Sequence, residues 1–301
     1  MKSHLYNSGF DFQNNYITVV QYAPEEQNVT KIAILPLAYD DPSAYWETVG
    51  NELKNLKKTF KFSNPEAVCS LPSEHSVVKK IIVDWSEGNL AQAMEWELSQ
   101  QIIAPVEEYV FDYQQIPSVG DEKVYLLVAM RKEKLARLSE AVKNIKLNPA
   151  TIDLDSFALI NVFEANYPEL LADPVLIVHS EPLRTKLVLS AGGHFVDSAF
   201  FQHDDQSIEQ QEYCDIIARE TARLTALNSA EVAGGDPRIF LAGSLFAQQK
   251  KNGAFNGVLS DAQMLNPFRK INCQIGAEES QLENYSAQLA VAVGLALRGN
   301  E

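Results

Sequence analysis

The chain has 301 residues, of which 25 are Lys or Arg and 40 are Asp or Glu, so its formal net charge is −15. A chain of this length is expected to form about two domains with a substantial core. Its negative charge repels phosphate backbones and anionic lipid headgroups at long range. This argues against general nucleic-acid or membrane-surface binding. A local basic patch could still exist on such a chain.

No apolar run approaches the roughly 18 residues that are needed to span a bilayer. The stretch 1–6 lacks the apolar centre of a signal peptide, so we expect a cytoplasmic protein. Cys69, Cys214 and Cys273 are far apart and odd in number, which argues against a disulfide framework or a zinc site. We expect them to be buried free thiols.

Alternating apolar and polar residues predict three strands at the start of the chain, over 5–12, 16–22 and 31–37. Asp41 then opens a helix as its N-cap, with Pro42 at the first helical position. A buried strand is predicted over 66–71, and Pro72 ends it. The order is therefore three strands, a helix and a strand.

The same order returns in the second half of the chain. Its expected elements are strands over 175–179, 185–190 and 195–201, a helix over 208–228 and a strand over 238–243. Each copy also ends in a helix, over 155–167 in the first and 281–298 in the second, where Gly294 would let a neighbouring backbone come close. The β-β-β-α-β unit is thus duplicated.

An additional block interrupts the first copy. Its expected elements are strands over 77–83, 109–116 and 123–130 and helices over 89–103 and 131–145. We therefore expect residues 1–75 with 149–172 to form one core, 76–148 an inserted subdomain, and 173–301 a second core. The last helix of the block is the densest basic stretch of the chain, which suits a solvated helix face or an interaction surface.

A duplicated core of this kind with an insertion in its first copy is the arrangement of the actin-like, ribonuclease H-like α/β fold. Four segments narrow the comparison: 70–79, 93–113, 153–159, and the C-terminal stretches 266–268 and 290–299. With these segments the chain resembles the PilM family of type IV pilus assembly proteins, which are relatives of the cell-division protein FtsA.

The resemblance implies a scaffold at the cytoplasmic face of the inner membrane. Proteins of this family bind ATP between their two halves and hold the N-terminal cytoplasmic peptide of the membrane protein PilN. On this chain the peptide groove would lie between the inserted block and the first core. The sequence leaves open both the oligomeric state and the machinery served, whether pilus, competence or type II-like secretion.

The resemblance also implies where a nucleotide would bind. Actin-like ATPases hold phosphates with hairpin turns in which glycines let backbone N–H groups approach the anion and an aspartate orients magnesium. The first turn should read G-x-D-x-G-S, and here Gly9 and Asp11 are kept while Gln13 takes the second glycine's position. Asn14 and Asn15 could still supply positive φ and amide donors. Asp11 would be the magnesium residue if a magnesium nucleotide binds.

The second turn should read D-I-G-x-x-x-T, and only its final residue, Thr185, is kept. His179 replaces the aspartate, Glu181 places a carboxylate where a phosphate would lie, and Pro182 removes a backbone donor. Two such anions a few ångströms apart in a partly buried site repel by about a few kcal/mol.

A third turn, S-G-G-G on the adenosine side, keeps only Gly243. The segment that builds the smaller second subdomain in the family, subdomain 2B, is also reduced, because the chain passes almost directly from residue 201 to the helix near 208. That segment normally helps to wall the nucleotide cleft. Both features predict a degenerate nucleotide cleft.

We therefore expect a pseudo-ATPase scaffold with no cofactor and no assigned catalytic residue. One alternative is a working ATPase in which bound magnesium-ATP switches the angle between the halves. Another is a relative of sugar or acid kinases, for which the sequence offers no additional catalytic carboxylate. His179 suits a structural role as well as that of a base or metal ligand, and helix capping explains one of Asp153 and Asp155.

Overall fold

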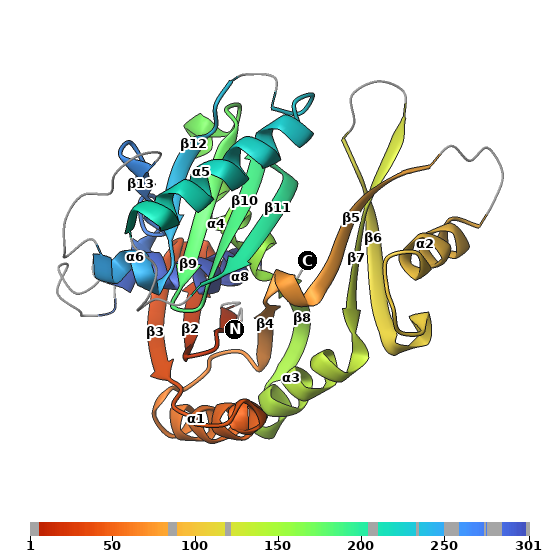
Figure 1. Cartoon of the computed structure of the whole chain (residues 1–301). Helices are drawn as coiled ribbons and strands as arrows, with labels where there is room; N and C mark the ends of the chain where they lie inside the picture. The colour runs from red at the N-terminus through yellow and green to blue at the C-terminus, as the bar shows by residue number, and fades with distance from the viewer. Residues whose placement is uncertain are drawn as a thin grey trace.

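The computed structural model describes residues 6–83, 89–117, 122–203, 210–232, 235–249, 259–273, 275 and 285–298. Within these ranges no helix has the length and apolar character that crossing a bilayer requires. The chain forms two large sheets with helices between and outside them, and a third, smaller sheet that stands to one side (Figure 1).

The first sheet has the strand order β14-β3-β2-β1-β4-β8. Its elements and their helices are β1 (Asn7–Phe12), β2 (Tyr16–Ala23), β3 (Asn28–Pro36), α1 (Tyr45–Thr59), β4 (Glu66–Leu71), β8 (Asn148–Leu154) and α4 (Asp155–Asn166). The first three strands form an antiparallel meander, while β4 runs parallel to β1. Asp41 caps the short 3-10 turn that leads into α1, since its side chain accepts a hydrogen bond from the Ser43 N–H at 2.8 Å.

The second sheet has the strand order β11-β10-β9-β12-β13 and repeats this plan. Its elements are β9 (Val175–Glu181), β10 (Arg184–Ala191), β11 (His194–Gln202), α5 (Gln210–Leu227), β12 (Arg238–Ala242), α6 (Ser244–Gln249) and β13 (Gln263–Met264). The chain then returns to the first sheet through β14 (Asn272–Cys273) and ends in α8 (Ala290–Arg298). The predicted duplication is confirmed.

Five layers result from the alternation of side chains along the strands. One face of the first sheet packs on α1, and the outer face of the second sheet packs on α5. The helices α4 and α8 fill the space between the two sheets, together with the inner face of each. Because β-strand side chains alternate between faces, each sheet buries apolar residues on both sides.

The contact between α4 and α8 depends on a glycine. A Cβ atom at Gly294 would lie 1.9 Å from the backbone oxygen of Ala158, and one at Gly9 would lie 2.1 Å from the backbone oxygen of Ala292. The close approach that the sequence predicted for Gly294 is confirmed. At Gly9 the missing side chain is explained by the passage of α8 over β1.

The third sheet, β5-β7-β6, is the inserted one. It contains β5 (Ser76–Val83), β6 (Tyr109–Ile116) and β7 (Lys123–Arg131), and α2 (Leu90–Ser99) covers one of its faces. The following helix, α3 (Lys132–Asn144), packs its buried residues Leu138 and Val142 into the first core beside α1. This packing favours an inserted unit that ends near Arg131, whereas we predicted a block that continues to residue 148.

Several predicted details need correction. The helix expected over 89–103 ends at Ser99, and the final helix is divided into a 3-10 turn, Ser286–Leu289, and α8, with 281–284 outside the described residues. Cys69 and Cys214 are buried and outside any disulfide as expected, but Cys273 is only half-buried. Neither Asp153 nor Asp155 caps α4, whose N-cap is Leu154 without a side-chain hydrogen bond.

Candidate nucleotide cleft and the junction between the halves

The residues of the predicted cleft come from strands that face each other across the middle of the molecule. Strand parity turns Phe10 and Phe12 of β1 toward α1, so the intervening Asp11 points away from that layer. On β10, Leu187 and Leu189 pack toward α5. The side chains of alternate parity, Arg184 and Lys186, therefore point toward the first half.

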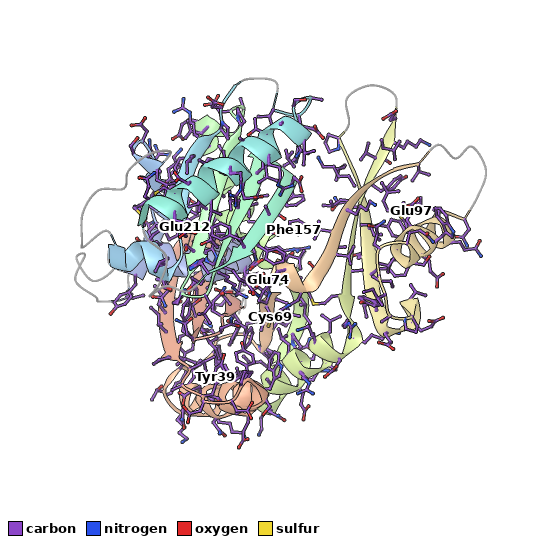
Figure 2. All side chains as sticks on the ribbon, in the orientation of Figure 1. Tyr39, Cys69, Glu74, Glu97, Phe157 and Glu212 are labelled. Carbon is purple, nitrogen blue, oxygen red and sulfur yellow. The ribbon has the colours of Figure 1, made fainter. Side chains whose placement is uncertain are left out.

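Two basic residues of β10 form ion pairs with carboxylates of the first half. The Lys186 ammonium contacts Asp155 Oδ2 and lies 3.0 Å from Glu74 Oε2, and the Arg184 guanidinium pairs with Glu74 Oε1. Lys186 is 3% exposed and Asp155 1% exposed. Figure 2 shows Glu74 at the centre of the molecule, beneath the strands of the second sheet. These contacts join the two halves directly.

Gln13 connects the same two halves. Its Nε2 donates to both carboxylate oxygens of Asp11 at 2.9 Å, and its Oε1 accepts a hydrogen bond from Arg184. Ser70 Oγ also donates to Asp11 Oδ1 at 2.9 Å. The glutamine that stands in the position of a phosphate-turn glycine thus acts as a bridge. Asn14 and Asn15 do not have positive φ, so the left-handed backbone that we considered for them is wrong.

Glu181 is the third point of contact. Its carboxylate accepts hydrogen bonds from the hydroxyl of Tyr16 on β2, and from both the backbone N–H, at 3.0 Å, and the hydroxyl of Ser244. Ser244 follows Gly243, where the resemblance places the third turn. The N–H of Gly243 itself donates to the backbone oxygen of Ala287 at 2.9 Å, and its φ is +98°. The Glu181 carboxylate therefore occupies the two donors of Ser244, next to the glycine of this turn.

The buried charges shift the pKa values of these groups in opposite directions. Burial raises the pKa of Asp11 to about 7, although the hydrogen bond from Gln13 opposes the shift. Burial would also raise the pKa of Asp155, but the adjoining Lys186 ammonium outweighs it and holds that pKa at about 2. Burial raises the pKa of Glu181 despite its donors from Ser244 and Tyr16. Among these three carboxyl groups, the negative charge is therefore most favoured on Asp155, beside the Lys186 ammonium.

His179 faces the same junction but is electrically neutral. Burial lowers its pKa to about 3, and its Nε2 lies 3.5 Å from Glu181 Oε1 without a hydrogen bond among the described residues. Within the described ranges no group of three or more His, Cys, Asp or Glu side chains is arranged to hold a metal ion.

Not all predicted site residues meet in this junction. Asp11, Gln13, His179 and Glu181 do. Thr185 has the opposite parity, and its hydroxyl bonds to Ser180, His203 and Tyr213 beside α5. Asn14 is exposed at the hairpin turn. Gly9 lies under α8, and Gly243 lies against the backbone of Ser180.

Sequence reasoning missed four residues of the junction: Tyr16, Glu74, Lys186 and Ser244. One signal was available for Lys186, since a lysine inside the apolar strand 185–190 needs a carboxylate partner if it is buried. Glu74 and Asp155 lie in two of the four family-like segments, 70–79 and 153–159. Those segments meet in space at the junction.

A separate groove lies between the inserted sheet and the first core. It has a volume of about 240 Å³, and strands β6 and β7 line one side, where α2 leaves their other face uncovered. Ile152, Leu154 and Phe157 of β8 and α4 line the opposite side. Val110 of β6 is 48% exposed at this groove. Most of the described residues that line this groove are apolar.

Comparison with known proteins agrees with this architecture. The family described as type IV pilus assembly protein PilM matches residues 9–176, more than half of the chain. The chain belongs to the PilM family of type IV pilus assembly proteins. Membership in this family associates it with pilus assembly. No curated protein sequence matches the chain.

Solved structures show the same fold. A PilM-PilN type IV pilus biogenesis complex is similar with a TM-score of 0.76 and 20% identity, covering 99% of each chain. A Bacteroides thetaiotaomicron protein with an actin-like ATPase fold matches with a TM-score of 0.51 and 12% identity, covering 90% of this chain and 93% of its own. The ethanolamine utilization protein EutJ from Carboxydothermus hydrogenoformans matches with a TM-score of 0.50 and 10% identity, covering 98% and 90%. The fold is actin-like.

Proposed function

We propose that this protein is a nucleotide-independent scaffold of type IV pilus assembly. It acts at the cytoplasmic face of the inner membrane, where it holds the N-terminal cytoplasmic peptide of a PilN-like membrane protein. The observation that carries this proposal is the groove between the inserted sheet and the first core, on a fold shared with a protein solved as a PilM-PilN complex.

The groove has the chemistry that suits an extended apolar peptide. Val110, Leu126 and Met130 present apolar surface from the uncovered face of β6 and β7, and Phe157 faces them from α4. In addition, β6 is an edge strand that pairs only with β7 in the described sheet. A peptide strand could add to this edge through main-chain hydrogen bonds while its side chains enter the groove.

The junction supports independence from nucleotide. Among the described residues, the carboxyl groups of Asp11, Glu74, Asp155 and Glu181 lie beside the cations Arg184 and Lys186, and both cations already have carboxylate partners. A triphosphate would add further negative charge, and each close pair of like charges costs about 4 kcal/mol at an effective dielectric constant near 20. These residues do not fit a magnesium nucleotide, and the chain's own ion pairs join the halves in its place.

The Val110→Glu substitution tests the groove. We expect it to weaken binding of the PilN-like peptide at least about tenfold, because a carboxylate would be buried against apolar walls. The measurement is a titration of the labelled peptide by fluorescence anisotropy, with and without magnesium-ATP, and the affinity should be the same in both.

Ile82→Glu is the matched control, since Ile82 is 62% exposed on β5 of the same sheet but lies outside this groove. It should retain the affinity of the unmodified chain. Equal loss in both variants, or no loss in Val110→Glu, would argue against the groove. A scrambled peptide that bound as tightly would argue against the partner.

A further inference from the structure

The positive charge of this acidic protein is concentrated in one layer. Residues 45–61 and 131–146, which form α1, α3 and the residues beside them, contain ten Lys or Arg and four Glu. The rest of the chain has 15 basic against 36 acidic residues. The two helices pack side by side and lie together along the lower edge of the molecule in Figure 1, remote from the second sheet. We call this layer the α1–α3 face.

The basic side chains of the α1–α3 face are available to a partner. On α1 and just after it, Lys54, Lys57, Lys58 and Lys61 are all exposed and recur on one side of the helix. On α3, every basic residue from Arg131 to Lys146 is exposed except Lys134, which is half-buried. Among the basic residues of this face, and within the part of the chain that the structure describes, only Arg137 has an ion-pair partner, Glu133.

Local helix stability does not account for the whole pattern. Basic residues near a helix C-terminus interact favourably with the helix dipole, which explains Lys57, Lys58 and Lys143 in the last turns. Lys57 also donates to the backbone oxygen of Ile145 at the end of α3. The dipole effect falls off within the last turn, so it leaves the basic residues at the start of α3 and at Lys54 unexplained.

The C-terminal ends of the two helices enclose a hollow that an anion would suit. It has a volume of about 390 Å³ and is lined by Lys57, Lys61 and Lys146, with Phe60 and Phe62 beside them and no carboxylate in its lining. In such a hollow the ammonium groups would contact a phosphate, and the apolar rings would contact the glycerol or acyl portion of the same lipid.

We propose that the α1–α3 face docks on the anionic phospholipid surface of the inner membrane, with the hollow receiving headgroup phosphates. The cations are spread along two neighbouring helices as well as around the hollow, which suits an extended anionic plane better than a short acidic segment. At physiological salt the Debye length is about 8 Å, so the acidic remainder of the chain is largely screened from that plane. The proposal rests on the proposed function only for the expectation that a membrane lies nearby.

Vesicle sedimentation with the full chain and no partner peptide tests this docking. We expect binding to vesicles of phosphatidylglycerol mixed with phosphatidylcholine at low salt, weaker binding at physiological salt, and none to phosphatidylcholine alone. Because each basic residue at such a surface contributes about a fivefold gain, the triple variant Lys54→Gln, Lys61→Gln, Lys146→Gln should bind about a hundredfold more weakly. None of these three side chains donates in a described hydrogen bond, so the fold should be retained.

The matched control removes three basic charges elsewhere, in Lys123→Gln, Arg219→Gln, Arg223→Gln, and should bind as the unmodified chain does. Equal losses in the two triple variants would overturn the proposal, as would no binding of the unmodified chain to anionic vesicles at low salt. Binding to polyglutamate without binding to vesicles would also overturn it and would assign the face to an acidic protein segment. Since the partner peptide is absent, failure here leaves the groove proposal intact.

Discussion

Replacing Lys186 by methionine is expected to lower the free energy of unfolding by about 3–5 kcal/mol, because Asp155 and Glu74 would remain buried without their shared cation. The measurement is urea unfolding at neutral pH. Lys80→Met is the matched control: Lys80 pairs with Glu231 at 2.9 Å, but both side chains are partly exposed, and such pairs contribute only about 0–1 kcal/mol. If both variants lowered the free energy of unfolding by a similar amount, the buried ion pairs of the junction would not be a main source of stability.

The cost of Lys186→Met should also depend on pH. Lys186 lowers the pKa of Asp155 from its ordinary 3.8 to about 2, so this stabilisation is fully present above pH 3.8 and is lost as the pH falls through 2. Without Lys186, burial raises the pKa of Asp155, so the difference between the unmodified chain and the variant should begin to shrink above pH 3.8 and go on shrinking down to about pH 2. A difference that stayed constant down to the acid limit would argue against a charge-based contact. The pKa of Asp11 is raised from 3.8 to about 7, so its contribution to the free energy of unfolding has the opposite pH dependence. That contribution is fully present below pH 3.8 and is lost as the pH rises through about 7.

The second large effect is expected at the contact between the central helices. Gly294→Ala should destabilise the chain by about 3 kcal/mol, because its Cβ would lie 1.9 Å from the backbone oxygen of Ala158, which cannot move without shifting α4. Thermal or urea unfolding measures this loss. Gly50→Ala is the matched control, since Gly50 lies inside α1 and a Cβ there meets nothing within 4 Å.

Alanine at position 50 should stabilise α1 by about 0.5–1 kcal/mol through its higher helix propensity. Opposite signs for the two glycine variants would confirm that packing, and not helix propensity, decides the result at Gly294. If Gly294→Ala were neutral, the close approach of α8 and α4 would be wrong.

The order of elements could be predicted from sequence because each one carries a local signal. Strand alternation, the Asp41-Pro42 helix start and the regular apolar spacing along the helices all depend on neighbours in the chain. The placement of α3 could not be predicted in this way. Its apolar stripe shows which side is buried, but not whether α2 and the inserted sheet or α1 and the first sheet cover that side.

The candidate site could likewise be predicted only where the signal lay within one local motif. Asp11, Gln13 and Glu181 were found through their positions in the phosphate turns. The ion pairs beside them were not found, because Arg184 and Glu74 are 110 residues apart in sequence and Lys186 and Asp155 are 31 apart. The sequence identified Gln13 only as a substitution at a glycine position, whereas the two ends of its amide join Asp11 to Arg184. A single position in a motif does not reveal whether a substituted side chain blocks a ligand or makes a contact of its own.

We propose that the chain's own side chains, and not a nucleotide, hold the two halves together. Thermal melting during a titration with magnesium-ATP tests this, because a ligand that binds only the folded state raises the melting temperature increasingly as its concentration exceeds its dissociation constant. The PilN-like peptide serves as the positive control for a ligand that binds. We expect an unchanged melting temperature at all magnesium-ATP concentrations. A saturable rise of several degrees would contradict it.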